Sequence, residues 1–261
     1  MKKLTLCLLL ICLAFSFSAC SNKNAKLNQI RARNNGAGLL RVGVKVDVPN
    51  FGYYNPDTGN IEGLEIDLAH EMAELLLGNR DAVEFVPTTG MTKETLIGNG
   101  EVDLIVGTYT ITDARKKVVN FSRPYYTDEI GFLVLNNSDI ETLAQFPGKT
   151  IGVTRTSTAF SSFDQTPEVI GEGFILRGFA SYPEIQDALM SGAIDIFSAD
   201  KSILSGYKND ACRILDVGVQ PQPYGIGSLI TDNAFAKEVD TLLGKLMDNG
   251  TMDKILEKWL N

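Results

Sequence analysis

Two stretches of this chain, residues 96–108 and 189–200, carry the same pattern, and this internal repeat limits the folds available to the chain. Each stretch starts at the end of an apolar helical pattern, turns at Gly100 or Gly192, and enters a short apolar run typical of a buried strand. A unit that occurs twice predicts two similar lobes. Helix, glycine and strand also recur by chance in α/β proteins, so the repeat alone leaves that alternative open.

Polar residues occupy matching positions in the two copies. Counting from the two glycines aligns Asp103 with Asp195, and Thr108 with Asp200. Thr108 and Asp200 come just past the carboxyl end of each predicted strand, which is where open α/β sheets bind their ligands. We therefore expect these two residues to lie at a binding site.

The first third of the chain alternates between strand and helix patterns. Residues 39–44, 83–86 and 102–106 are typical of strands. A helical pattern that ends at Gly78 lies between the first two and is formed by Leu68, Met72, Leu75 and Leu76. This alternation predicts an α/β fold with a mostly parallel sheet covered by helices.

The N-terminus has the pattern of an export signal. Two lysines precede an apolar run at residues 4–13, which is too short to span a bilayer as a helix. Small residues then lead into Cys20, and this arrangement resembles the lipobox of bacterial lipoproteins, in which the cysteine is acylated. We expect residues 1–19 to be a lipoprotein signal peptide and Cys20 to be lipidated. A plain signal cleavage near Ala19 is the alternative.

Composition excludes several kinds of partner and stabilisation. The formal net charge is −8, so nucleic acid is not an expected partner, and the membrane would be reached through the Cys20 lipid. Residues 20–37 are predicted to form a lipid-anchored flexible tether, with at most one helical turn around residues 27–30. After cleavage only Cys20 and Cys212 remain, so stability is expected from core burial and not from a disulfide.

Arg115 stands in an unfavourable position for a helical residue. Thr112 is a candidate helix N-cap, which makes Arg115 the third helical residue, and a cation near the positive end of the helix dipole is destabilising. With free backbone N–H groups and the hydroxyls of Thr108, Thr110 and Thr112 nearby, its guanidinium could hold a carboxylate. A solvated basic helix face is the alternative, because two lysines follow Arg115 directly.

Several motifs, in order along the chain, resemble those of family 3 extracellular solute-binding proteins, which serve polar amino-acid ABC importers. The most specific is TITDARKK at residues 110–117, followed by NFSRPYY at residues 120–126. Supporting motifs lie at residues 42–45, 61–69, 146–153 and 249–255. The resemblance covers about residues 39–259, nearly all of the body.

This resemblance implies a two-lobed, periplasmic-binding-protein-like α/β fold of class II, in which a hinge motion closes the lobes over a ligand. Each lobe would be a mostly parallel sheet flanked by helices. Lobe 1 would comprise residues 38–128 and 225–261, and lobe 2 residues 129–224. The implied partners are a free polar amino acid, an ABC permease and its ATPase subunit, and the protein is expected to be a monomer.

The resemblance also assigns roles at the ligand. Arg115 would bind the α-carboxylate with help from Thr110 and from backbone near Thr108, and Asp200 of lobe 2 would bind the α-ammonium. Closure would then depend on the ligand, because an empty closed clamp buries both charges. Ser157 and Thr158 would reach the same carboxylate. Helix capping is the alternative for Ser157, Thr158 and Asp200, and for Asp200 the two roles are compatible.

Three candidate cations are expected near the ligand side chain: Lys45 and Lys93 from lobe 1 and Arg155 from lobe 2. They favour an acidic side chain, and the resemblance is strongest to proteins that take glutamate, aspartate or glutamine. Binders of basic amino acids usually carry an aromatic lid where Val48 stands. Residues 92–97 depart from the Thr-Arg-Gly-Pro-Leu-Leu of similar proteins, and a lysine cannot reproduce the two-pronged grip of that arginine. A solvated surface residue is the alternative for Arg155.

Other chemistry finds little support in the sequence. The single His70 supplies neither a metal cluster nor a catalytic triad, so no metal and no cofactor are expected. The rival functions are a cyclohexadienyl-dehydratase-like enzyme on the same fold and a ligand-sensing or adhesin surface protein. Turnover of a prephenate-like substrate would identify the enzyme.

Overall fold

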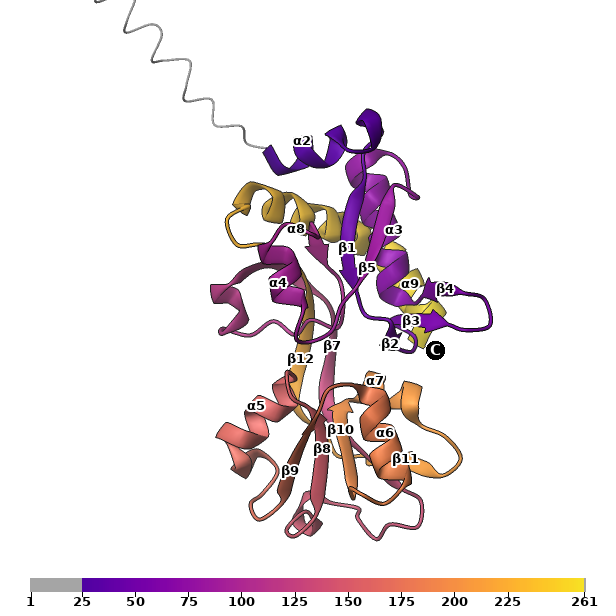
Figure 1. Ribbon diagram of the computed structural model, residues 1–261, viewed down its shortest axis with the longest axis vertical. Coiled ribbons are helices and arrows are strands. Elements are labelled where there is room, and N and C mark those ends of the chain that lie inside the picture. Colours follow the sequence, from indigo (N-terminus) through magenta and orange to yellow (C-terminus); the bar gives the residue numbers. More distant parts are fainter. Residues whose placement is uncertain (1–24, 261) are drawn as a thin grey trace, which may run out of the picture.

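The computed structural model describes residues 25–260, so the predicted signal peptide (residues 1–19) and the predicted lipidation site Cys20 lie outside the described residues. Figure 1 shows two α/β lobes joined by a narrow waist. Within residues 25–260, no helix combines the length and the apolarity needed to cross a bilayer. Cys212 is a buried free thiol.

The upper body in Figure 1 is lobe 1. Its elements are α2 (Ala25–Ala32), η1 (Asn34–Gly36), β1 (Leu40–Val44), β2 (Asp47–Val48), β3 (Gly52–Asn55), β4 (Asn60–Glu62), α3 (Leu64–Leu77), β5 (Val83–Pro87), α4 (Lys93–Gly98), β6 (Leu104–Ile105), η2 (Arg115–Lys117), α8 (Asn233–Asp248) and α9 (Thr251–Leu260).

The lower body is lobe 2. Its elements are η3 (Leu143–Gln145), β8 (Thr150–Thr154), α5 (Thr158–Gln165), η4 (Pro167–Val169), β9 (Ile175–Phe179), α6 (Tyr182–Met190), β10 (Ile196–Asp200), α7 (Lys201–Tyr207) and β11 (Cys212–Ile214). Two longer strands, β7 (Val119–Leu135) and β12 (Val219–Leu229), run through both lobes and form the waist.

The strand order is β5-β1-β6-β12-β7-β10-β8-β9, with β11 paired to β7. In lobe 1, β1 lies parallel to β5 and β6, and in lobe 2, β8 lies parallel to β9 and β10. The crossing strands β7 and β12 are antiparallel to each other. The prediction of a two-lobed α/β fold with mostly parallel sheets is confirmed. The expected lobe boundaries, near residues 128 and 225, fall within these two crossing strands.

The internal repeat folds into equivalent units, α4–β6 in lobe 1 and α6–β10 in lobe 2. In lobe 1, Asp103 accepts the backbone N–H of Arg41 at 2.9 Å and donates its own N–H to the Arg41 carbonyl at 2.8 Å. In lobe 2, Asp195 makes the same pair of bonds to Thr150, at 2.7 and 2.9 Å. Each aspartate therefore fixes the register between its strand and the parallel neighbour.

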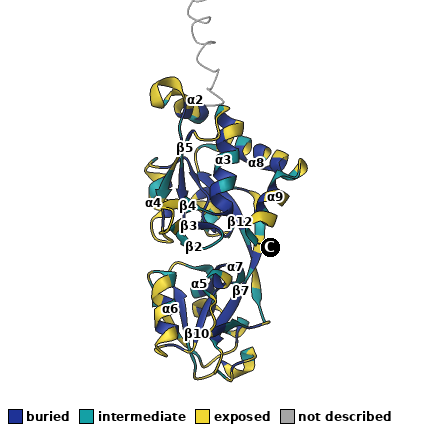
Figure 2. Ribbon diagram, turned by 90° about the vertical axis from the view of Figure 1, so that its right-hand side faces the viewer, coloured by how far each residue is buried: buried dark blue, intermediate teal, exposed yellow. Residues whose placement is uncertain are grey.

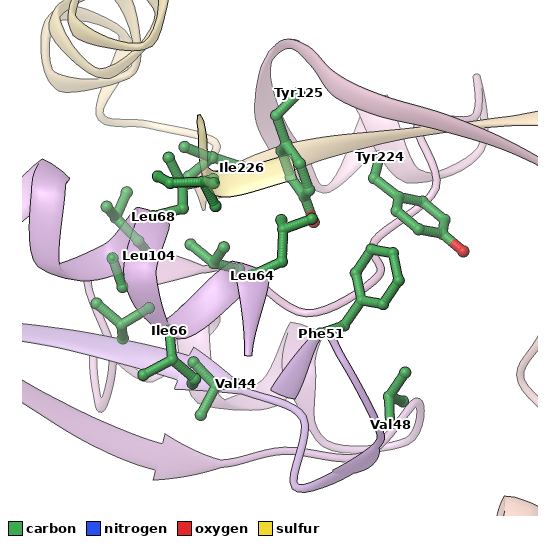
Figure 3. Packing of buried hydrophobic residues seen from close by; sticks show 14 of the residues in the cluster. Val44, Val48, Phe51, Leu64, Ile66, Leu68, Leu104, Tyr125, Tyr224 and Ile226 are labelled. Carbon is green, nitrogen blue, oxygen red and sulfur yellow. The ribbon is translucent and has the colours of Figure 1, made fainter. Parts of the chain in front are cut away.

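Helix α3 shows how the sequence shapes the core of lobe 1. The helix is preceded by Gly63 at φ 139°, where a Cβ atom would lie 2.1 Å from the Phe51 carbonyl oxygen, and it ends at Gly78 with φ 72°. Its buried face includes Leu64, Leu68, Met72 and Leu76. In Figure 3, Leu64 and Leu68 point toward Tyr125 and Ile226, which belong to the two crossing strands.

The N-terminal segment differs from the expected tether. Helix α2 buries Leu27 and Ile30 against lobe 1. Lys26 Nζ lies 2.9 Å from Asp103 Oδ1, and Arg33 Nη2 donates to the same oxygen at 2.9 Å. Burial of Asp103 opposes its ionisation, but these bonds hold the pKa of Asp103 below its usual range. The tether prediction is therefore wrong for residues 25–37, because they find partners far along the chain.

The last helix, α9, packs against α3. Met252 and Ile255 are buried, and the indole N–H of Trp259 donates to Asp67 Oδ2 at 2.8 Å. Lys258 donates to the same carboxylate oxygen at 2.6 Å. In Figure 2 the buried residues continue through both lobes and along the waist, while exposed residues cover the outer helices. Lobe 1 is therefore completed by the C-terminal end of the chain.

Candidate functional site

A cavity lies between the two lobes, and both lobes contribute to its wall. Eight of the nine predicted ligand-binding residues line it: Lys45, Lys93, Thr108, Thr110, Arg115, Ser157, Thr158 and Asp200. The aligned repeat positions Thr108 and Asp200 therefore meet at one cavity from opposite lobes, as the strand ends predicted. What these groups can bind follows from their partners.

Arg115 enters the cavity wall from lobe 1 on the short turn η2. Its backbone N–H donates to Thr112 Oγ1 at 3.2 Å. The turn is a three-residue 3₁₀ helix that begins at Arg115 with Ala114 at its N-cap, so the prediction that Arg115 is the third residue of a helix capped by Thr112 is wrong. Its guanidinium donates to the Thr110 carbonyl at 2.9 Å and, across the cleft, to the Thr156 carbonyl at 3.2 Å. The centre of the guanidinium lies 4.9 Å from the centre of the Tyr109 ring. These contacts hold a planar cation at the cavity.

Asp200 supplies an acid from lobe 2. The Tyr224 hydroxyl donates to Asp200 Oδ2, and burial raises the pKa of Asp200 to about 7. Asp200 directly precedes α7, yet its side chain does not cap that helix. Asp128 takes this role, because its Oδ2 accepts the Ser202 N–H at 2.9 Å. The carboxyl of Asp200 is thereby left for the cavity, and a cation bound there would favour its charged form.

Helix α5 begins at the cavity with Ser157 and Thr158. The Ser157 hydroxyl accepts the Phe160 N–H at 3.0 Å and donates to the Thr154 carbonyl at 2.8 Å. The Thr158 hydroxyl donates to Gln222 at 2.6 Å. Ser157 is therefore the N-cap of α5, and both hydroxyls already have partners. The N-terminus of α5 still offers backbone N–H groups and a dipole suited to a carboxylate.

Lys45 does not stand alone as a cation. Its Nζ lies 2.8 Å from Asp47 Oδ1 and 5.4 Å from the centre of the Tyr182 ring. Asp47 and Tyr182 also line the cavity. This part of the wall therefore presents an ammonium and a carboxylate side by side, which together can serve a ligand group that both accepts and donates hydrogen bonds.

Lys93 lies in the cavity wall but is almost fully buried, with 5% of its surface exposed. Its Nζ donates to the Gly107 carbonyl at 2.6 Å and lies 4.7 Å from the centre of the Tyr109 ring. Burial, together with the charges of Arg115 and Lys45, lowers the pKa of Lys93 well below its ordinary value. Lys93 is thus already bound to backbone.

Arg155 is the predicted site residue that the structure does not bring to the cavity. Thr154 ends β8 and lines the cavity, so the next side chain points to the other face of the strand. Arg155 is exposed, and its stem lies over Gly178, where a Cβ atom would come within 2.7 Å of Arg155 Cγ. The structure therefore leaves Arg155 out of the cavity wall.

Sequence reasoning missed several wall residues, among them Asp47, Thr154, Thr156 and Tyr182. Asp47 follows Lys45 at strand spacing, and that was the available signal for a pair on one face. Tyr182 is a lone tyrosine, and nothing in its sequence surroundings distinguishes it from a structural residue. Within residues 25–260, no group of three or more His, Cys, Asp or Glu side chains could hold a metal ion.

The two lobes touch each other around the cavity. On one side, Thr156 of lobe 2 lies against Gly90 of lobe 1, where a Cβ atom would come within 1.9 Å of Thr156 Oγ1. On the other side, the Tyr207 hydroxyl of α7 donates to the Asp47 carbonyl at 2.5 Å. A Cβ atom on Gly206 would lie 2.7 Å from Pro49 Cβ. This structure is therefore a closed arrangement of the lobes.

Comparison with known proteins identifies a family. The model of the bacterial extracellular solute-binding proteins, family 3, matches residues 40–261. A glutamine-binding protein of Geobacillus stearothermophilus is 37% identical over 205 residues, which cover 77% of each chain. The ABC transporter glutamine-binding protein GlnH of Bacillus subtilis (strain 168) is 31% identical over 244 residues, 92% of this chain and 87% of that protein.

A solved structure shares the whole architecture. The ancestral amino acid-binding protein AncCDT-1, described as a precursor of cyclohexadienyl dehydratase, superposes with a TM-score of 0.80. It is 29% identical in sequence, and the match covers 91% of this chain and 100% of that one. The two-lobed fold is thus shared over nearly the full body.

Proposed function

We propose that the cavity captures one free polar amino acid and delivers it to an ABC importer, because this chain belongs to the bacterial extracellular solute-binding proteins of family 3. The observation that carries the proposal is the pairing of Arg115 and Asp200 across one cavity. Lobe 1 offers a guanidinium for the α-carboxylate, with the N-terminus of α5 opposite it. Lobe 2 offers a carboxylate for the α-ammonium. Only a zwitterion between the lobes satisfies both charges.

The wall that would meet the ligand side chain favours glutamine, with glutamate and aspartate as weaker ligands. The three cations expected from the sequence suggested an acidic ligand. In the structure Lys45 is paired with Asp47, Lys93 is bound to the Gly107 carbonyl, and Arg155 lies outside the cavity. A carboxamide can accept from Lys45 and donate to Asp47, whereas a carboxylate would face the Asp47 charge. Two of the relatives named above are glutamine-binding proteins.

Membership of an extracellular family means that the protein is exported. We expect the finer arrangement to be a lipoprotein anchored through Cys20, acting as a monomer and delivering its ligand to a membrane permease with an ATPase subunit. Replacing the anchor, Cys20→Ser, should move the protein from the membrane fraction to the soluble fraction. Equal membrane association of the variant and the natural protein would contradict lipidation.

An enzymatic role is not proposed, although a solved relative is described as a dehydratase precursor. The acids that line the cavity have binding partners: Asp47 pairs with Lys45, and Asp200 accepts from Tyr224. A prephenate-like substrate incubated with the protein should remain unchanged. Dehydration of this substrate at a rate that depends on Asp200 would show instead that the protein is an enzyme.

Isothermal titration of the purified protein with glutamine, glutamate, aspartate, arginine and cystine tests the proposal. We expect glutamine to bind with a dissociation constant of about 1 μM or tighter, equivalent to about −8 kcal/mol. Arg115→Ala and Asp200→Ala should each lose several kcal/mol, because the opposite charge is left unpaired. Arg155→Ala is the matched control and should bind as the natural protein does. Binding of none of these amino acids, or a preference for arginine, would refute the proposal.

A further inference from the structure

One peptide group in the cavity wall is held between two oppositely charged, buried side chains. It joins Gly107 to Thr108. Lys93 Nζ donates to the Gly107 carbonyl at 2.6 Å, and the Thr108 N–H of the same peptide donates to Glu65 Oε1 at 2.5 Å. The negative end of the peptide dipole thus faces an ammonium and its positive end faces a carboxyl. Hydrogen bonds to charged groups are the strong ones, so this peptide plane is fixed from both ends.

The residue that follows this peptide has an unusual backbone. Thr108 has φ 42°, in the left-handed region that β-branched residues rarely enter. Such a conformation persists only where the surroundings enforce it, and it is concentrated at functional sites. Thr108 lines the cavity next to Thr110 and Arg115. The strained residue therefore stands where the α-carboxylate of the ligand is proposed to bind.

The two charged groups have little other use. Glu65 is fully buried, its Oε1 also accepts the Tyr125 hydroxyl at 2.5 Å, and its Oε2 has no hydrogen-bond partner. Burial raises the pKa of Glu65 and lowers that of Lys93, so each group is held at a cost. Lys93 itself contacts the Gly107 carbonyl and the face of the Tyr109 ring. The partner that Glu65 and Lys93 share is the Gly107–Thr108 peptide.

We infer that Glu65 and Lys93 are positioning residues that clamp the Gly107–Thr108 peptide and so hold Thr108 in the geometry required for ligand binding. This inference rests on the proposed function of the cavity. It gives Lys93 a different role from the ligand side-chain contact that the family resemblance implied. A side-chain contact would set the choice between amino acids, whereas a clamp at the α-carboxylate end acts on all of them equally.

Titration of two variants with glutamine, asparagine and glutamate separates these roles. Lys93→Met keeps the length of the side chain but removes the donor to Gly107, and Glu65→Gln keeps the shape but removes the charge. We expect Lys93→Met to weaken each ligand that the natural protein binds by roughly tenfold or more, and Glu65→Gln by a smaller factor. The ratio of glutamine to asparagine affinity should stay unchanged, because these two ligands carry equal charge. A changed ratio would assign Lys93 to the ligand side chain and overturn the inference.

Matched controls and a ligand-free measurement complete the test. Lys237→Met and Glu74→Gln alter exposed residues of lobe 1 and should bind as the natural protein does. In amide-proton NMR of the ligand-free protein, the Thr108 N–H should exchange slowly and resonate far downfield, and Glu65→Gln should reduce both effects. A Thr108 amide that behaves alike in both proteins would overturn the clamp, even if glutamine binds. Failure of every amino acid to bind would instead refute the proposed function, with the clamp still decided by this amide.

Discussion

Gly90→Ala tests whether the closed arrangement is the one that holds the ligand. Gly90 faces Thr156 across the cleft, and an added Cβ atom would lie 1.9 Å from Thr156 Oγ1 and 3.0 Å from Thr156 Cβ. Gly90 lies outside the left-handed region, so its backbone accepts alanine without strain. The substitution therefore acts only where the lobes meet.

The size of the effect follows from this geometry. Rotating the Thr156 hydroxyl out of the way leaves the tight contact to its Cβ atom, so the lobes must also separate slightly. Overpacking of a well-packed contact costs typically about 1–3 kcal/mol, which corresponds to roughly a 5- to 150-fold weaker dissociation constant. The added methyl touches nothing else in lobe 1 that would resist it, so the ligand-free melting temperature should stay as it was.

Calorimetric titration with glutamine measures the loss, and two further variants control it. Gly98→Ala, where a Cβ atom would meet nothing within 4 Å, should bind as the natural protein does. Combining Gly90→Ala with Thr156→Gly should recover most of the affinity, because the opposing atoms are gone. A dissociation constant for Gly90→Ala within twofold of the natural value would show that the ligand is bound with the lobes farther apart.

Three other predictions follow from the site and the fold. Burial raises the pKa of Asp200 to about 7, so at lower pH Asp200 must lose a proton before it can bind an ammonium. Glutamine affinity should therefore fall by up to about tenfold per pH unit below 7, and calorimetry that shows tighter binding in acid would contradict this. Tyr207→Phe removes the bond to the Asp47 carbonyl and should speed ligand dissociation in stopped-flow by roughly two- to tenfold, whereas an unchanged rate would exclude that contact from the complex. Arg33→Ala should lower the free energy of unfolding in urea by about 1 kcal/mol or more, since Asp103 loses a buried partner; no change would mean that α2 is not docked in solution.

The fold could be predicted largely from local patterns. The repeat around Gly100 and Gly192 indicated two lobes, and Thr108 and Asp200 at the strand ends indicated where the lobes would meet. These signals work because a parallel sheet sends its carboxyl ends to one edge whatever the detailed packing. For Arg115 the local rule left two interpretations open, and the resemblance of residues 110–117 to the family motif assigned it to the ligand.

Most of the errors came from partners that no local rule provides. Residues 25–37 look like a tether because their few apolar residues form a weak pattern. Their helix is held by contacts with lobe 1, among them the ion pairs with Asp103 far along the chain. The outward direction of Arg155 depends on where β8 ends. Lys45 was counted as a free charge because the carboxylate two residues further on, Asp47, was not considered as its partner. Glu65 carried no sign that it would bind the Thr108 backbone.

The docking of α9 on α3 has a consequence for how the protein is made. Lobe 1 draws on both ends of the polypeptide, and the Trp259 bond to Asp67 spans 192 positions. During synthesis and secretion, the residues of α3 that α9 covers stay exposed until α9 has been made, whereas residues 129–224 of lobe 2 are contiguous and can assemble earlier. Lobe 1 should therefore remain incompletely folded after lobe 2 can form, a state suited to passage across a membrane.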